Sequence, residues 1–191
     1  MASLARPRFS PEQYLTQERQ AEFKSEYLAG ELFAMAGASY THNLIVANVL
    51  SELRNALRGS PCRAVANDQR VLIVETGLYT YPDLVIVCGE PHFSDDHLDT
   101  LLNPALIIEV LSPSNEAYDR GEKFAHYRRL NSLSDYVLIS QDKMRVEHFT
   151  REGERWVLSE ISMPNDKLSL PSFNCIVQLN TFYEYVKFTT S

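Results

Sequence analysis

The segment ALIIEVLSPSNEAYDRGEKFAHYRRL, residues 105–130, contains the two neighbouring elements that decide the fold class. Residues 105–111 form a short, continuous apolar run, which is typical of a strand buried on both faces of a sheet. Residues 115–130 are predicted to form a helix, despite a glycine at position 121. Because only a few residues separate the two elements, we expect the helix to fold back over the sheet.

Patterns on either side of this segment predict a mixed sheet with helices packed on it, an α/β (α+β) fold in one domain of residues 1–191. One helix is predicted to begin at Ser10, a capping residue followed by proline. A second helix, residues 39–59, shows the apolar period of an amphipathic helix. The other predicted strands are two short strands within residues 23–35, joined at Ala29-Gly30, and residues 62–66, 69–75, 83–88, 135–140, 145–150 and 155–161. Residues 181–188 fit either a helix or a strand.

The bulk properties of the chain limit the classes of function. The net charge is −7, which argues against indiscriminate DNA binding, because such binding depends on Lys and Arg neutralising phosphates. A local basic groove, a dimer that concentrates one, or a bound metal ion would still permit contact with DNA. No apolar run approaches the length of a membrane span, and the N-terminus lacks a signal-peptide core, so a cytoplasmic protein is expected.

The cysteines predict no disulfide framework. Cys62, Cys88 and Cys175 stand far apart, are odd in number and form no CxxC pair. Cys88 ends an apolar run, so a buried, inert thiol is expected at that position.

Glu109 is the sharpest anomaly in the sequence, because it lies inside the apolar run of residues 105–111. Strand parity places it on the same face as Ala105, Ile107 and Leu111. A buried carboxylate loses its hydration, which costs several kcal/mol unless a partner compensates. That partner could be a Lys or Arg in a structural ion pair, backbone donors, or a divalent cation.

Asp83 raises the same question at the start of a second apolar strand. Pro82 precedes it and fits there, because proline can open a strand but cannot donate to a central ladder. Taken alone, Asp83 reads equally well as a turn or cap residue. Together with Glu109, it could converge on one cation, and ligands that are all oxygen suit Mg²⁺ or Mn²⁺.

The predicted helix after Glu109 supplies a third group. Asp119, Lys123 and Tyr127 are spaced at i, i+4 and i+8, which places them on one helical face. A solvated helix surface would explain this spacing as well. Since the helix is expected to fold back over the sheet, its first turns could instead place the Lys123 side chain close to Glu109.

At this point the ordered residues resemble a known family. Glu26 in KSEYLAGE, His42 after a Gly-Ala-Ser segment, Pro82-Asp83, and EVLSPS followed by Asp119, Lys123 and Tyr127 resemble the Uma family of putative restriction endonucleases. That family belongs to the PD-(D/E)XK nuclease superfamily, and the resemblance covers roughly residues 10 to 160. It implies a restriction endonuclease-like core, with a mixed central sheet flanked by helices.

The resemblance also implies roles for individual residues. Asp83 corresponds to the acid of the PD element and Glu109 to the D/E of the second element, and the two would bind Mg²⁺ (or Mn²⁺). The carbonyl of Val110 would be a further ligand. The lysine expected two residues after Glu109 is replaced by Leu111, and the family points to Lys123 as the migrated lysine, expected at the site mouth with little part in packing.

The resemblance leaves the N-terminal acid open. The superfamily often supplies a glutamate from its first core helix, whereas Glu26 and Glu31 lie on the hairpin that precedes the corresponding helix. Either could approach the metal, and either could be a surface acid. His42, near the start of that helix, fits a packing or capping role as well as a site role.

Three functions are consistent with these observations. The first is a Mg²⁺-dependent DNA endonuclease, acting as a homodimer by analogy with relatives of this fold. The second is a non-catalytic binding or scaffold protein of the same fold, linked to mobile elements, which the acidic charge and the displaced lysine favour. The third is a metal-dependent phosphodiesterase that acts on RNA or a small nucleotide.

Overall fold

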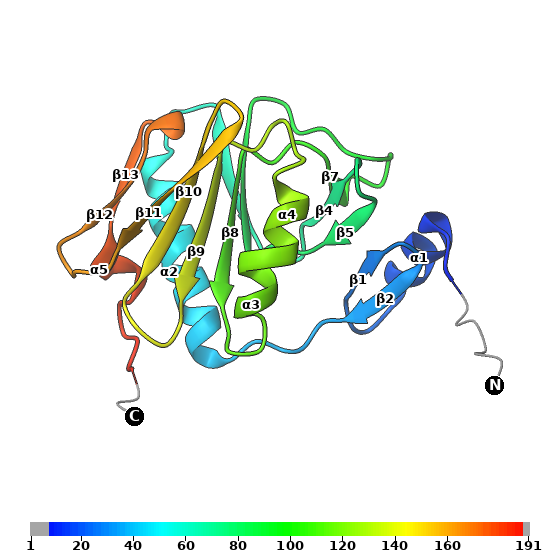
Figure 1. The fold of residues 1–191 in the computed structure, drawn as a ribbon, viewed down its shortest axis with the longest axis horizontal. Coiled ribbons are helices and arrows are strands. Elements are labelled where there is room, and N and C mark those ends of the chain that lie inside the picture. Colours follow the sequence, from blue (N-terminus) through cyan, green and yellow to red (C-terminus); the bar gives the residue numbers. More distant parts are fainter. Residues whose placement is uncertain (1–7, 189–191) are drawn as a thin grey trace.

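The computed structural model describes residues 8–188 and has a mixed six-stranded sheet at its centre (Figure 1). The strand order is β11-β10-β9-β8-β6-β3. Strand β8 pairs in parallel with β9 and antiparallel with β6, so the predicted mixed sheet is confirmed. The strands are β3 (Cys62–Ala66), β6 (Leu84–Cys88), β8 (Leu106–Leu111), β9 (Asp135–Ser140), β10 (Val146–Glu152) and β11 (Arg155–Ile161).

Two smaller sheets accompany the central one. A five-stranded sheet has the order β2-β1-β5-β4-β7, and a two-stranded sheet joins β12 to β13. These strands are β1 (Ser25–Leu28), β2 (Glu31–Ala34), β4 (Arg70–Ile73), β5 (Leu78–Thr80), β7 (Thr100–Leu101), β12 (Lys167–Leu170) and β13 (Cys175–Gln178). Strands β5, β7, β12 and β13 were not predicted from the sequence. Strands β5 and β7 have only three and two residues, too few for a period to emerge.

The predicted helices are present, with one change. Ser10 and Ser39 cap the helices α1 (Pro11–Glu18) and α2 (Tyr40–Ala56) through their side chains. The helix after β8 consists of α3 (Glu116–Tyr118), a π-helical turn η1 (Asp119–Lys123) and α4 (Phe124–Tyr127). The chain also has a short 3₁₀ helix, η2 (Pro171–Phe173), and a last helix, α5 (Leu179–Phe182).

Helices cover both faces of the central sheet (Figure 1). On one face α2, the β12–β13 pair and α5 pack on a core that includes Leu106, Ile108 and Val110 of β8. On the other face α4 and the strands β4 and β5 pack on a core that includes Ile107 and Leu111. The predicted parity is confirmed for residues 106–111, whereas Ala105, which precedes β8, packs against the core of Leu106 instead of that of Ile107. Among residues 8–188, no helix is both long and apolar enough to cross a membrane.

The prediction that no disulfide forms is wrong. Cys62 and Cys88 stand directly opposite each other on β3 and β6 and are joined by a disulfide, while Cys175 is free and buried. The pairing follows from the register of two strands whose cysteines are 26 residues apart. Neither the spacing nor the number of cysteines in the sequence reveals that register.

Two arginines, the partly exposed Arg19 and the buried Arg70, share one carboxylate and join the N-terminal helix to the rest of the fold. Arg19, just after α1, contacts Asp99 at 2.8 Å, and the buried Arg70 contacts the same carboxylate at 2.8 Å. The hydrogen bond from Arg19 holds the pKa of Asp99 well below its usual value, with a further contribution from Arg70. The acidic loop of residues 91–99 is therefore anchored through its carboxylates.

We expect Asp99→Asn to lower the free energy of unfolding at pH 7 by about 1 kcal/mol, a value reduced because the pair is partly exposed. A depressed folded-state pKa contributes stability above the unfolded pKa and loses it as the pH falls. The difference between parent and variant should therefore shrink from pH 7 to pH 3 in urea denaturation. Asp96→Asn, at an exposed position in the same loop, should change neither the free energy of unfolding at pH 7 nor its dependence on pH. A constant difference across this pH range would contradict the assignment.

Candidate active site

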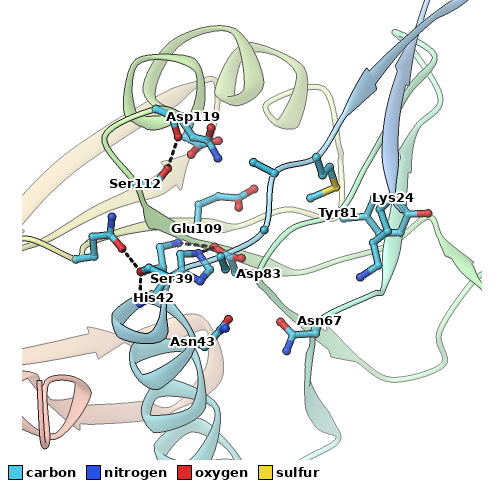
Figure 2. A pocket seen from close by; sticks show the side chains of 18 of the residues that line it. Lys24, Ser39, His42, Asn43, Asn67, Tyr81, Asp83, Glu109, Ser112 and Asp119 are labelled. Atoms are coloured by element: carbon cyan, nitrogen blue, oxygen red, sulfur yellow. Dashed lines mark hydrogen bonds and ion pairs between the residues drawn. The ribbon is translucent and has the colours of Figure 1, made fainter. Parts of the chain in front are cut away.

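Asp83 and Glu109 lie on neighbouring strands and line the same cleft, which has a volume of about 650 Å³ (Figure 2). Asp83 immediately precedes β6, and its Oδ2 accepts a hydrogen bond of 2.8 Å from the backbone N–H of Val110 on β8. This bond holds the Asp83 carboxylate against the strand that carries Glu109. The structure thus brings together the two acids that the sequence analysis selected.

Lys123 lies over Glu109 from the following π-helical turn. Its Nζ is 3.0 Å from Oε1 of Glu109, 3.3 Å from Oε1 of Glu26 and 3.5 Å from Oδ1 of Asp119. The side chain reaches Glu109 from the next element, as a migrated lysine would. The expectation that it sits at the site mouth is wrong, because Lys123 is only 6% exposed and is packed among three carboxylates.

The π-helical turn η1 keeps Asp119, Lys123 and Tyr127 on the side that faces the sheet. All three are buried, and the Tyr127 hydroxyl donates a hydrogen bond of 2.8 Å to Oε1 of Glu109. The Tyr136 hydroxyl of β9 donates to the backbone carbonyl of Asp119 at 3.0 Å. Such turns are rare and often occur at functional sites, because they displace a few side chains without ending the helix.

Of the two candidate N-terminal acids, only Glu26 joins this cluster. Glu26 is buried in β1, accepts a short hydrogen bond from the Thr80 hydroxyl, and lies 3.4 Å from the Tyr118 hydroxyl. Glu31 is exposed at the start of β2 and is absent from the cleft lining. Glu26 is brought to the cluster through β1, which pairs with β5, the strand that carries Thr80.

His42 contacts Asp83 from the first turn of α2. Its Nε2 lies 3.1 Å from Oδ2 of Asp83, and its backbone N–H donates to the capping side chain of Ser39. Burial alone would lower the pKa of His42, but the hydrogen bond and charge of Asp83 outweigh burial and raise it. His42 and the backbone N–H of Val110 therefore contact the same oxygen, Oδ2 of Asp83, and together hold the carboxylate in place.

The cluster carries more negative than positive charge. Burial raises the pKa of Glu109 and of Asp119, although Lys123 opposes the shift in both. Burial would lower the pKa of Lys123, but the charges of Glu109, Glu26 and Asp119 raise it well above its usual value. One lysine thus faces three carboxylates in a buried site, an arrangement that additional positive charge would stabilise.

Asp83 and Glu109 are the residues of the cleft that could hold a divalent cation, because each has one carboxylate oxygen outside this network. The contacts within residues 8–188 use Oδ2 of Asp83 and Oε1 of Glu109, and none uses the second oxygen of either carboxylate. In the same part of the chain, no group of three or more His, Cys, Asp or Glu side chains is gathered in metal-binding geometry. A site with two carboxylates is one that Mg²⁺ would occupy while keeping several waters.

The sequence analysis missed three residues of the cluster: Thr80, Tyr118 and Tyr136. Thr80 lies in β5, which is too short to predict. Tyr118 falls within the selected helix, one residue before Asp119, and a search for hydroxyl groups on that helix could have found it. Tyr136 reaches the cluster from β9, and only the three-dimensional arrangement reveals that contact.

Comparison with known proteins identifies the family of this chain and two similar sequences. The model of the Uma2 family, described as "Putative restriction endonuclease", matches residues 11–181. The chain belongs to the Uma2 family. Among the relatives of this Uma2 chain, the uncharacterised Synechocystis sp. protein sll1609 is 38% identical over 157 residues, covering 82% of this chain and 89% of the relative. A second uncharacterised Synechocystis sp. protein, slr1290, is 34% identical and covers 95% of both chains.

A solved structure confirms the fold expected of an Uma2 chain. The crystal structure of a protein from Anabaena variabilis, described as a putative nuclease belonging to DUF820, superposes with a TM-score of 0.75. It covers 92% of this chain and 98% of its own, at 17% sequence identity. The family resemblance and the predicted nuclease-like fold are therefore confirmed.

Proposed function

We propose that this Uma2 chain is a Mg²⁺-dependent endonuclease that hydrolyses phosphodiester bonds in DNA. The observation that carries the proposal is the position of Lys123, whose ammonium lies 3.0 Å from Glu109 although its backbone belongs to the next element. A lysine beside the second acid, in a cleft that the first acid also lines, is the arrangement that the nuclease superfamily implies. Membership of a family described as restriction endonucleases supports the same function.

The residues of the cleft would divide the chemistry among them. Asp83 and Glu109, with the carbonyl of Val110, would hold Mg²⁺ or Mn²⁺, which supplies Lewis-acid chemistry at the scissile phosphate. His42 fixes the orientation of Asp83, and Tyr127 fixes that of Glu109, so that each carboxylate keeps one oxygen for the metal. Glu26 balances the charge of Lys123 and is the N-terminal acid of the site.

Lys123 would act as a fixed positive charge. Burial lowers the pKa of Lys123, but in the metal-free protein the charges of Glu109, Glu26 and Asp119 outweigh burial and raise it, which favours the protonated form. A protonated lysine cannot accept the proton of the attacking water. It would instead orient that water or the phosphate and stabilise the negative charge that develops in the transition state.

The experiment that tests this function is a nuclease assay on supercoiled, linear and single-stranded DNA, with EDTA, Mg²⁺ or Mn²⁺. We expect the parent to cut DNA only with a metal, and Asp83→Asn to reduce the rate by about 100-fold or more, because loss of a positioned charge in a buried site has effects of that size. Glu31→Gln is the matched control, since it removes an exposed acid of the same chain outside the cleft, and it should leave the rate unchanged.

Two results of this assay would favour one of the alternative functions over a DNA endonuclease. Absence of cleavage by the parent with every metal and DNA form would favour a non-catalytic nuclease-fold binding protein. Hydrolysis of RNA or a dinucleotide without hydrolysis of DNA would favour the phosphodiesterase alternative. We also propose a homodimer, since two symmetric sites would suit the two strands of a duplex, and light scattering of the purified chain tests that state.

A further inference from the structure

The charge of the cleft argues against entry of an intact duplex. Proteins that grip duplex DNA neutralise several phosphates with Lys and Arg. Among residues 8–188, no arginine lines the cleft, and its acids outnumber its lysines. The charged lining residues are Glu22, Asp68, Asp83, Glu109, Asp119, Lys24 and Lys123. Because duplex DNA carries a higher density of negative charge than a single strand, the acidic lining repels a duplex more strongly than it repels a single strand.

The volume of the cleft and the contacts between its walls also argue against entry of a duplex. Its volume of about 650 Å³ lies in the range of small-ligand sites, which suits a nucleotide better than a double helix. Two contacts join segments across it: the Ser39 hydroxyl donates to Gln141 at 3.1 Å, and Lys24 forms a close ion pair with Asp68. Figure 2 shows Ser39 and Lys24 on opposite sides of Asp83.

The rim of this polar cleft carries an exposed aromatic side chain. Phe23 is 77% exposed, and the neighbouring Met35 is 36% exposed; both line the cleft. The backbone N–H of Met35 donates to the carbonyl of Lys24 at 2.9 Å, so Met35 is held beside the segment that carries Phe23. An exposed aromatic ring beside a catalytic cleft is a platform on which an unpaired base can stack.

A polar side chain lies next to the proposed metal ligands. Asn67 is exposed, lines the cleft and donates its backbone N–H to the carbonyl of Asp83 at 3.1 Å. Its side-chain amide points into the cleft beside Asp83 (Figure 2). Because an amide both donates and accepts, it can pair with the edge of a base that has left the duplex.

We propose that the strand to be cut enters this cleft unpaired, with one base stacked on Phe23 and the next base in reach of Asn67. The substrate is then single-stranded DNA, or the single-stranded part of a gapped or displaced duplex. This inference rests on the proposed nuclease function. It goes further, because that function alone does not distinguish paired from unpaired DNA.

Binding tests the inference without relying on turnover. Fluorescence anisotropy of a labelled single-stranded oligonucleotide, with Ca²⁺ in place of Mg²⁺, should give at least tenfold tighter binding than its blunt duplex. Phe23→Ala should weaken single-strand binding by about tenfold, in the range measured for stacking of one base, and Phe23→Trp should retain it. Phe33→Ala is the matched control, because Phe33 is 49% exposed in the adjacent hairpin and does not line the cleft.

Cleavage separates failure of this inference from failure of the nuclease function. Faster cutting of single-stranded and gapped DNA than of a continuous duplex, with a loss in Phe23→Ala alone, supports both. Equal cutting of the continuous duplex, or equal losses in Phe23→Ala and Phe33→Ala, overturns the inference and leaves the nuclease function standing. Single-strand binding that depends on Phe23, without cleavage under any metal, overturns the nuclease function and leaves the binding site for an unpaired strand.

Discussion

Lys123→Met is expected to lower the free energy of unfolding of the metal-free protein by about 3–5 kcal/mol, the loss typical when one partner of a buried ion cluster is removed. Methionine fills a similar volume, so the loss would be electrostatic. Lys123 is the cation nearest to Glu26, Glu109 and Asp119, and its removal leaves three buried carboxylates facing one another. Urea denaturation at pH 8 in EDTA measures the effect.

Addition of a divalent cation should distinguish this cluster from an ordinary salt bridge. Mg²⁺ at millimolar concentration should restore part of the lost stability in Lys123→Met, because it supplies positive charge to the same carboxylates. Lys143→Met, at an exposed position, should show neither the loss nor the recovery. Full stability of Lys123→Met in EDTA would show that the ammonium does not hold this cluster together.

Catalysis should be affected more strongly than stability. At a temperature where Lys123→Met remains folded, turnover is expected to fall by about 100-fold or more, because under the proposed function the variant would lack the charge that stabilises the transition state. Lys123→Arg should not restore full activity, since a planar guanidinium cannot replace a compact ammonium among three carboxylates. Full nuclease activity in Lys123→Met would remove the lysine from the mechanism.

Glu109→Gln is expected to change stability in the opposite direction. The free energy of unfolding of the metal-free protein should stay the same or rise by about 1–3 kcal/mol, while Mg²⁺ binding is lost. Lys123 keeps two carboxylate partners in this variant, and one buried negative charge disappears. A large loss of stability in EDTA would instead make Glu109 a structural partner of Lys123.

The pH dependence of this difference follows from the raised pKa of Glu109, which is caused by burial and opposed by Lys123. A raised folded-state pKa means that ionised Glu109 destabilises the fold, and the more so as the pH rises. The advantage of Glu109→Gln should therefore be largest at high pH and fade as the pH falls. Isothermal titration with Mg²⁺ measures binding, and Glu122→Gln, exposed in the same π-helical turn, is the matched control.

The site residues that could be predicted from the sequence lie in or next to a strand or helix with a clear apolar pattern. The apolar run around Glu109 gave both the strand and the face on which the carboxylate lies, because alternation along a strand is strict. Asp83 followed from its place at the start of the neighbouring strand. Lys123 came from the family resemblance together with the short connection between strand and helix.

Contacts between distant segments could not be predicted in the same way. The choice between Glu26 and Glu31 depends on the pairing of β1 with β5, a strand of three residues that carries no period. The contact of His42 with Asp83 joins residues 41 positions apart, and no local pattern reports it. The disulfide between Cys62 and Cys88 depends in the same way on strand register.

The π-helical turn has a consequence for how this segment is compared with its relatives. A π-helical turn accommodates one residue more than an α-helical turn, so residues on either side of it do not share one helical wheel. If residues 116–127 were drawn as a regular α-helix, the angle between the Glu116 and Tyr127 side chains around the helix axis would be wrong by about 100°. A relative with an uninterrupted α-helix here would need a one-residue gap within the helix in its alignment with this chain. Without that gap, the relative's equivalent of Lys123 would be aligned one position away from Lys123.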